Sequence, residues 1–226
     1  MTALLAATGI GKSFGGTRVL DGVTLSIAPG EPVGLFGPNG SGKTTLANVL
    51  SGLLSPDEGT IAFDGGDVTR MPLDARYRLG IARTFQIPHP YPSLTVQEAV
   101  RVAVGSAGPR AVPAGGTREE EVGEILSRAG LFDQRLVPCG RLSQGCLRRL
   151  EFARSLACRP RLLILDEVFS ALSAADEEEL LALLRTVNRE SGAAFLLISH
   201  NRMLLSATCR RILYLEDGRV VREKAV

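Results

Sequence analysis

The stretch GPNGSGKTT, residues 37–45, constrains the fold more than any other part of the chain. It fits the pattern G-x-x-x-x-G-K-[ST], follows an apolar run and precedes a segment with helical spacing, which is the context that this phosphate-binding loop requires. In such a loop the glycines let backbone N–H groups face phosphate oxygens, the lysine reaches the β- and γ-phosphates, and the next hydroxyl binds Mg²⁺. A glycine-rich turn that matches by chance is the alternative. The expected phosphate-binding residues are Gly37, Pro38, Asn39, Gly40, Ser41, Gly42, Lys43, Thr44 and Thr45, with Thr44 also as a magnesium ligand.

A second motif, LLILDE, occupies residues 162–167. Its continuous apolar run is typical of a strand that is buried on both faces. Asp166 would end that strand, where it can hold Mg²⁺ through water, and Glu167 is placed to orient or deprotonate an attacking water. The alternative is an acid that only caps the end of a strand. Next to a phosphate-binding loop, the catalytic interpretation is favoured.

Strand-like apolar runs alternate with helical patterns along most of the chain, which predicts an α/β sheet. We expect strands at 31–36, 60–63, 80–84, 161–165 and 195–199, and a helix at 42–53. The dipeptide Asp217-Gly218 between two β-rich runs predicts a hairpin.

The middle of the chain differs, because residues 87–159 are predicted to be mostly helical. Helices are expected at 95–104 and 117–129, the second with a capping box of Thr117 and Glu120. We therefore expect one domain, residues 1–226, in which 1–86 and 160–226 form an α/β nucleotide-binding core and 87–159 form a helical subdomain.

The overall composition excludes several classes of function. Lys and Arg number 26 against 24 Asp and Glu, the net charge is +2, and tryptophan is absent. This balance argues against nucleic acid as a partner. Four cysteines without a C-x-x-C spacing, together with two histidines, argue against a zinc site and suit reduced thiols. The start of the chain lacks the features of a secretory signal, and no apolar run approaches the ~20 residues of a membrane span.

The stretch RLSQGCLRRLEFARSL, residues 141–156, contains an unusual helix start. Ser143 is a good N-cap, but Gly145 lies within the first turn, where glycine costs about 1 kcal/mol relative to alanine. Either the helix begins poorly, or the backbone at Gly145 must approach something that leaves no room for a side chain.

Five motifs in this order resemble the ATP-binding cassette (ABC) ATPases, the nucleotide-driven motors of ABC transporters. They are GPNGSGKT, RTFQ with Gln86, LSQGC, LILDE and LLISH with His200, and the resemblance extends from Phe14 to the hairpin. It implies a P-loop NTPase (RecA-like) core with an N-terminal antiparallel β region and an inserted α-helical subdomain. It also implies ATP and Mg²⁺ as cofactors.

The resemblance assigns roles to individual residues. Glu167, His200 and Gln86 are implied to be catalytic: His200 contacts the γ-phosphate, and Gln86 contacts Mg²⁺ or water and senses the membrane partner. Phe14 is implied to stack on adenine; the alternative is that it is a core residue. For Gln86, the alternative to a catalytic role is a solvated loop residue. LSQGC matches the family signature, usually LSGGQ, which caps the γ-phosphate bound by the other subunit of a head-to-tail dimer. The residues implied to make that contact are Ser143 and Gly145.

The sequence departs from the family pattern at a few positions. Gln144 and Cys146 replace the first glycine and the glutamine of the signature, and Val168 replaces a proline. Ser173 replaces an acidic or amide residue; it can still cap a helix, with Asp176 at the third position, but a carboxylate that reaches across the dimer is lost. These changes keep open a second hypothesis, a hydrolytically weak regulatory subunit paired with a more active ATPase.

GIARTFQ and FGGTRVLDGV resemble the ATPase subunits of branched-chain and hydrophobic amino-acid importers. The expected partners are transmembrane permease subunits, a second ATPase subunit in a homo- or heterodimer, and an extracytoplasmic solute-binding protein. The proline-rich stretch that contains Tyr91 lies where the permease docks in this family. The expected location is peripheral, at the cytoplasmic face of the plasma (inner) membrane. The ATPase of an ABC exporter is the alternative to the importer function.

Overall fold

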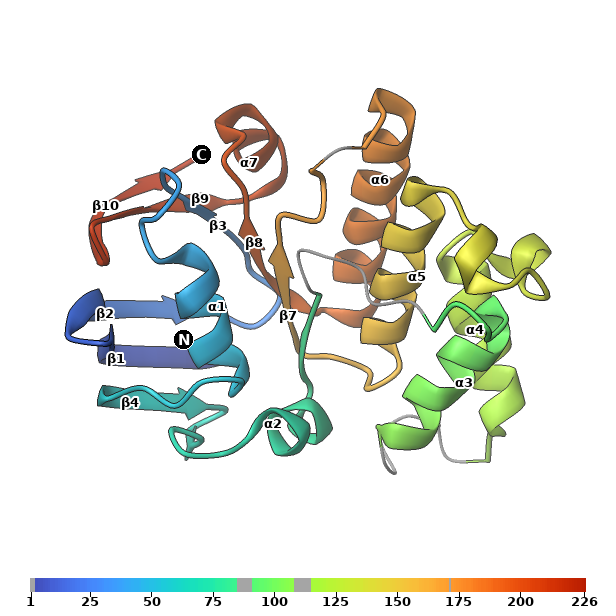
Figure 1. Ribbon diagram of the computed structural model, residues 1–226, viewed down its shortest axis with the longest axis horizontal. Coiled ribbons are helices and arrows are strands. Elements are labelled where there is room, and N and C mark those ends of the chain that lie inside the picture. The colour runs from blue at the N-terminus through green and yellow to red at the C-terminus, as the bar shows by residue number, and fades with distance from the viewer. Residues whose placement is uncertain (1–2, 85–90, 108–114, 171) are drawn as a thin grey trace.

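The computed structural model describes residues 3–84, 91–107, 115–170 and 172–226 (Figure 1). The strands are β1 (Leu5–Phe14), β2 (Thr17–Ile27), β3 (Pro32–Phe36), β4 (Glu58–Phe63), β5 (Gly66–Asp67), β6 (Ile81–Arg83), β7 (Leu162–Asp166), β8 (Ala194–Ile198), β9 (Arg211–Glu216) and β10 (Arg219–Ala225). The helices are α1 (Lys43–Ser51), α2 (Leu73–Leu79), α3 (Val96–Ser106), α4 (Arg118–Arg128), α5 (Gln144–Leu156), α6 (Ala174–Ser191) and α7 (Arg202–Thr208), with 3₁₀ turns η2 (Phe132–Gln134) and η3 (Cys139–Arg141).

The central sheet has six strands in the order β10-β9-β3-β8-β7-β6. The neighbouring pairs from β9 to β6 are parallel, and β10 returns antiparallel to β9 in the predicted hairpin. Every residue of β7 and β8 is buried, as their uninterrupted apolar runs predict. Because the strands are parallel, the carboxyl ends of β3, β7 and β8 meet at one edge of the sheet, and the motif residues follow these ends.

A second, antiparallel sheet has the order β2-β1-β4-β5 and contains the N-terminal strands. Its apolar face packs with α1 and one face of the central sheet into a continuous core, which includes Ile10, Leu20, Leu46 and Leu196. The expected P-loop core with an N-terminal antiparallel β region is confirmed. The sequence did not predict the separate strands β1 and β2 or the short helices α2 and α7.

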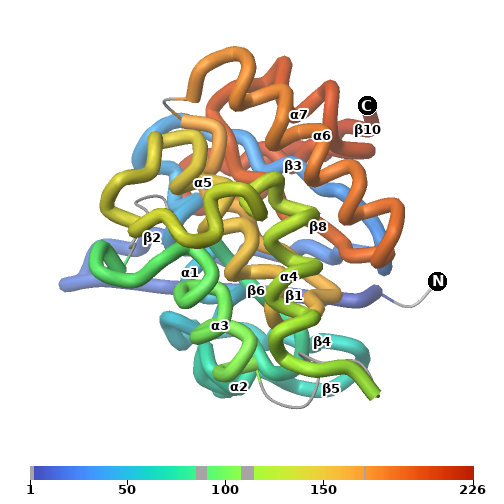
Figure 2. Tube along the Cα trace, turned by 90° about the vertical axis from the view of Figure 1, so that its right-hand side faces the viewer, coloured from blue at the N-terminus to red at the C-terminus, as the bar shows by residue number. Residues whose placement is uncertain are grey.

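Helices α3, α4 and α5 lie at the end of the molecule opposite the antiparallel sheet (Figure 1), and Figure 2 looks onto this helical end. Both α3 and α4 begin with a capping box, Thr95 with Glu98 and Thr117 with Glu120, the second as predicted. Their apolar faces join α5, α6 and the other face of the central sheet in a second core. Among the described helices, none has the length and apolar character needed to traverse a bilayer.

Candidate nucleotide-hydrolysis site

The phosphate-binding loop lies between the end of β3 and the start of α1, as predicted. Gly40 and Gly42 have φ angles of 83° and 100°, which residues with a side chain rarely adopt. At Gly37 a Cβ atom would lie 2.2 Å from the Leu215 carbonyl oxygen, so packing also requires glycine there. Lys43 donates hydrogen bonds from Nζ to the carbonyls of Gly37 (2.7 Å) and Pro38 (2.8 Å). The lysine is thus folded back along the loop that would hold the phosphates.

A cavity of 310 Å³ opens at this loop. Besides Val19 and Glu167, its lining consists of loop and α1 residues: Asn39, Gly40, Gly42, Lys43, Thr44 and Thr45. The N-terminus of α1 faces it, and the unpaired N–H groups and dipole there favour an anion. The sequence-predicted loop and the predicted base are therefore brought to one cavity.

Asp166, the last residue of β7, is fully buried. Burial raises the pKa of its carboxyl, and the Arg83 guanidinium and the Thr44 hydroxyl oppose that rise. Its Oδ2 accepts a bond from Arg83 Nη2 at 3.3 Å, whereas Oδ1 has no hydrogen-bond partner within the described residues. A buried carboxylate oxygen without a partner, close to the Thr44 hydroxyl, is an oxygen-donor set that suits Mg²⁺. The residues present therefore fit the metal.

Glu167 and His200 meet because β7 and β8 are adjacent parallel strands and each residue follows one strand end. His200 Nδ1 lies 3.0 Å from Glu167 Oε2. The Glu167 side chain is 12% exposed and the His200 side chain 67% exposed, so Glu167 is partly buried and His200 is exposed. Glu167 has φ 49°, an unusual backbone conformation for a residue with a side chain.

Phe14 and the signature residues stand apart from this cavity. Phe14, the last residue of β1, is 46% exposed, and the Lys12 ammonium lies 5.6 Å from its ring centre. Phe14 is therefore not a core residue, which removes that alternative. Ser143 caps α5 by accepting a hydrogen bond from the Cys146 N–H at 3.2 Å, as predicted.

A contact within the same chain explains why a glycine occupies position 145. A Cβ atom at this position would lie 2.1 Å from Oδ1 of Asp176, in the first turn of α6. Asp176 is held by Ser173, whose Oγ donates to Asp176 Oδ2 at 2.6 Å and accepts from the Asp176 N–H at 3.2 Å. The predicted Ser173 cap is therefore present. The start of α5 is well formed. The group that closely approaches the backbone of Gly145, as expected from the glycine, is the Asp176 carboxylate of the same chain.

Gln86 lies outside the described residues. Arg83 was not predicted to belong to the site, although it contacts Asp166 directly. The sequence feature that could have identified Arg83 is its charge. It ends the otherwise apolar strand Ile81–Arg83, and a buried charged residue needs a partner.

A glycine-rich loop between the buried parallel strand β3 and helix α1, with Asp166 and Glu167 at the carboxyl end of β7 in the same sheet, defines a P-loop nucleoside triphosphatase. A family model described as ABC transporter matches residues 20–170, about two thirds of the chain. The chain therefore belongs to the ABC transporter family, as the nucleotide-binding ATPase.

Relatives with assigned names support the same family. The chain is 38% identical over 232 residues to the lipoprotein-releasing system ATP-binding protein LolD 1 of Caulobacter vibrioides, covering 97% of this chain and 95% of the relative. It is 36% identical over 219 residues to a probable ABC transporter ATP-binding protein of Azorhizobium caulinodans, covering 97% and 76%. It is 35% identical to the methionine import ATP-binding protein MetN of Rhizobium johnstonii, covering 97% of this chain but 60% of that protein.

Solved structures agree with the fold. The ATP-binding cassette MJ1267 of an ABC transporter superimposes with a TM-score of 0.89 at 28% identity, over 100% of this chain and 92% of that one. The cassette MJ0796, in a dimeric post-hydrolysis state bound to ADP and Pi, gives 0.86 at 29% identity, over 98% of both chains. The protein is an ABC ATPase, a member of a family whose subunits dimerise and work with transmembrane permeases.

Proposed function

We propose that this chain is the ATP-hydrolysing motor of a membrane transporter, with Glu167 as the general base. The observation that carries this assignment is that Glu167 lines the phosphate cavity and lies 3.0 Å from His200 Nδ1 through its Oε2. His200 orients the Glu167 carboxylate, and Glu167 accepts a proton from the attacking water while the backbone N–H groups of the loop hold the phosphates. Lys43 leaves its carbonyl partners to contact the β- and γ-phosphates.

Thr44 and Asp166 are the proposed magnesium ligands, Asp166 through water, and Gln86 is proposed to contact the metal or the water. When bound, Mg²⁺ would supply positive charge that neutralises the phosphate oxygens during transfer. The protein's own contribution is to place there a buried carboxylate oxygen, Asp166 Oδ1, that has no hydrogen-bond partner among the residues the structure describes. Phe14, exposed and at the end of β1, is proposed to stack on the adenine ring.

Glu167→Gln tests this proposal. The amide cannot accept the proton, so we expect phosphate release to fall by at least about 100-fold. ATP binding should persist, and ATP-bound dimers should accumulate in size-exclusion chromatography. Glu58→Gln, at an exposed glutamate on β4, is the matched control and should retain turnover. A Glu167→Gln variant with wild-type phosphate release would remove Glu167 from the role of base.

Ser143 and Gly145 are proposed to cap the γ-phosphate bound by a second ATPase subunit. Ser143 is exposed at the start of α5, which supports this role, whereas Gly145 is covered by Asp176 of its own chain. Gln144, Cys146 and the loss of an acidic residue at Ser173 support the second hypothesis, a weak ATPase in a heterodimer. The rate of phosphate release by the purified chain alone, compared with the rate in its native complex, separates the motor hypothesis from the weak-ATPase hypothesis.

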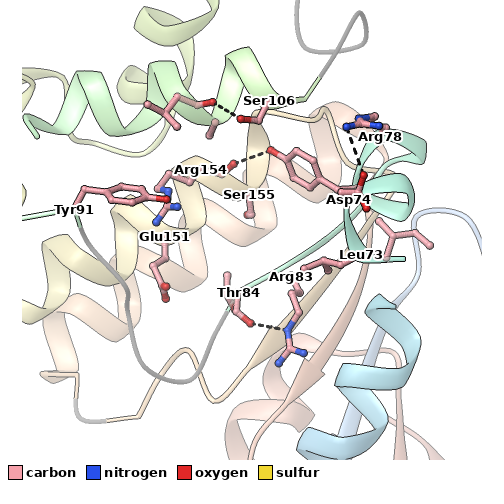
Figure 3. Close-up of a pocket in the computed structure, with 14 residues that line it drawn as sticks. Leu73, Asp74, Arg78, Arg83, Thr84, Tyr91, Ser106, Glu151, Arg154 and Ser155 are labelled. Carbon is pink, nitrogen blue, oxygen red and sulfur yellow. Dashed lines mark hydrogen bonds and ion pairs between the residues drawn. The ribbon is translucent and has the colours of Figure 1, made fainter. Parts of the chain in front are cut away.

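A groove of 370 Å³ is proposed to receive a permease segment. Figure 3 shows it between α2 and β6 on one side and α3 and α5 on the other. Its walls are apolar at Tyr77, Val102 and Ala103, and the Arg154 guanidinium lies 5.3 Å from the Tyr91 ring centre. Thr84 Oγ1 is buried in this wall with no hydrogen-bond partner among the residues described. Such a surface suits a short segment with an apolar side chain and a hydrogen-bonding group.

For the cargo, we propose amino-acid import, because MetN relatives are named for methionine import. The narrower expectation of a branched-chain importer finds no support in the relatives described above. The match to LolD 1 over almost its full length favours lipoprotein release as a second candidate. An importer would act at the cytoplasmic face of the inner membrane with a solute-binding protein. Purification of the native complex from membranes, followed by identification of its permeases and any solute-binding protein, separates these two candidates.

A further inference from the structure

Arg83 is a buried cation beside the proposed magnesium ligand. Its side chain is 3% exposed and that of Asp166 is 0% exposed, so the pair is shielded from solvent. Arg83 Nη2 donates to Asp166 Oδ2 at 3.3 Å, and Arg83 Nε donates to the carbonyl of Thr84 at 3.3 Å, the bond drawn in Figure 3. A buried ion pair of this kind costs several kcal/mol of desolvation. It is therefore weak as a source of stability, which points to a role in positioning.

The guanidinium also connects this pair to the helix of the phosphate-binding loop. Arg83 Nη1 donates to Asn48 Oδ1 and, at 3.4 Å, to Ser51 Oγ, both on α1. Strand β6 is paired in register with β7, with Arg83 opposite Ile164, two residues before Asp166. One planar side chain thus joins β6, β7 and α1, the elements next to the proposed metal position.

The two oxygens of Asp166 are in different environments because of this arrangement. Oδ2 is held by Arg83, and Oδ1 has no hydrogen-bond partner in the described part of the chain. A carboxylate fixed through one oxygen cannot rotate freely, so the other oxygen keeps its direction. Groups that orient a metal-binding carboxylate in this way change metal affinity by about 10- to 100-fold when removed from other sites.

We propose that Arg83 is a positioning residue for hydrolysis, which holds Asp166 Oδ2 and α1 together so that Asp166 Oδ1 is presented to the magnesium ion of bound ATP. The inference rests on the proposed magnesium role of Asp166. Arg83 acts through Asp166 and is not among the residues that line the phosphate cavity.

The test is equilibrium binding of a fluorescent ATP analogue to the full chain, measured once with Mg²⁺ and once with EDTA. Arg83→Met should weaken binding about tenfold with Mg²⁺ and less than about twofold with EDTA, because only the metal-dependent part is lost. Arg83→Lys should recover part of the difference, since an ammonium group reaches one partner but lacks the planar fork that joins two. Arg161→Met, which removes an exposed pair with Asp64, is the matched control and should change neither value.

Equal weakening with Mg²⁺ and with EDTA would make Arg83 a structural residue only and overturn the proposal. If Arg83→Met does not fold, Asn48→Ala tests the same idea by releasing the guanidinium from α1 without burying an unpaired charge. It should reduce the Mg²⁺-dependent gain in affinity about threefold, and an unchanged gain overturns the proposal. Asp166→Asn separates the two levels. If Asp166→Asn abolishes the Mg²⁺-dependent gain in affinity while Arg83→Met retains this gain, only the inference about Arg83 fails. If Asp166→Asn retains the gain, the proposed magnesium role of Asp166 fails, and the inference about Arg83 fails with it.

Discussion

At the residue scale, Glu167 is held in a strained backbone conformation. Its φ of 49° costs about 1–3 kcal/mol for a residue with a side chain, so the surrounding structure must fix it. The Glu167 N–H donates to the Ile198 carbonyl at 3.0 Å, and the Ser170 N–H donates to the Glu167 carbonyl at 3.1 Å. Val168, in place of the family's proline, is buried in the core. Hydrogen bonds and packing thus orient the carboxylate toward His200.

Cys146 and Cys209 offer a matched pair of thiols, 6% and 7% exposed. Burial opposes ionisation of Cys146, but hydrogen bonds involving Ser143, Arg149 and Gln134 outweigh it and lower its pKa. Burial raises the pKa of Cys209 to about 12. Because the thiolate is the reactive form, iodoacetamide at pH 8 should modify Cys146 well before Cys209 in the folded protein. Peptide mass spectrometry over time measures both rates, and equal rates would contradict the difference in ionisation.

At the scale of elements, α5 and α6 are locked together at their first turns. Asp176 on α6 lies directly against the backbone of Gly145 on α5, and Arg149 forms an ion pair with Glu179 at 2.9 Å. The helical segment that carries the signature is thus tied to α6, the helix that follows Asp166 and Glu167 in the chain. A carboxylate also occupies the space next to the helix start where the partner's γ-phosphate is proposed to approach.

Gly145→Ala tests this contact. The added methyl group would collide with Asp176, so we expect a loss of about 1–3 kcal/mol in the free energy of unfolding. With Asp176→Ala already in place, the same change should be neutral or stabilise by up to about 1 kcal/mol, since alanine is the better helix former. Urea denaturation of the four proteins without nucleotide completes the double-mutant cycle. Additive effects would show that the two residues do not interact.

At the scale of the whole molecule, the central sheet separates two hydrophobic cores. One core joins it to α1 and the antiparallel sheet, and the other joins it to the helical end seen in Figure 2. The phosphate cavity lies at the strand ends, and the groove lies between α2 with β6 and α3 with α5. Arg83 lines the groove and also contacts Asp166, the residue before Glu167 of the phosphate cavity.

Val102→Arg tests the groove as a permease-docking surface. Val102 is 47% exposed on α3, so arginine is tolerated by the fold but places a charge on the apolar wall. We expect at least about a tenfold loss of the chain from membrane complexes, as for an unpaired charge in an interface, with unchanged ATP binding. Val221→Arg, at a valine 56% exposed on β10, is the control. Equal recovery of the two variants with the membrane fraction would exclude docking in this groove.

Much of the fold followed from short-range patterns. The phosphate loop, the buried strands β7 and β8, the Thr117 capping box and the Ser143 and Ser173 caps each depend on residues close together in the chain. Strands β1 and β2 were not predicted individually, because their register shifts interrupt the alternation that identifies a strand. Helices α2 and α7 have seven residues each, too few for a clear helical period.

The sequence by itself determined the chemistry, since a phosphate-binding loop, an Asp-Glu pair and a helix cap are defined by adjacent residues. Only the tertiary structure decided how distant residues complete the site. Arg83 reaches Asp166 across 83 positions, and the backbone of Gly145 lies against the carboxylate of Asp176 on another helix. The pairing of Glu167 with His200 likewise depends on the parallel register of β7 and β8. Such contacts depend on how elements pack in space, which local propensity and spacing do not encode.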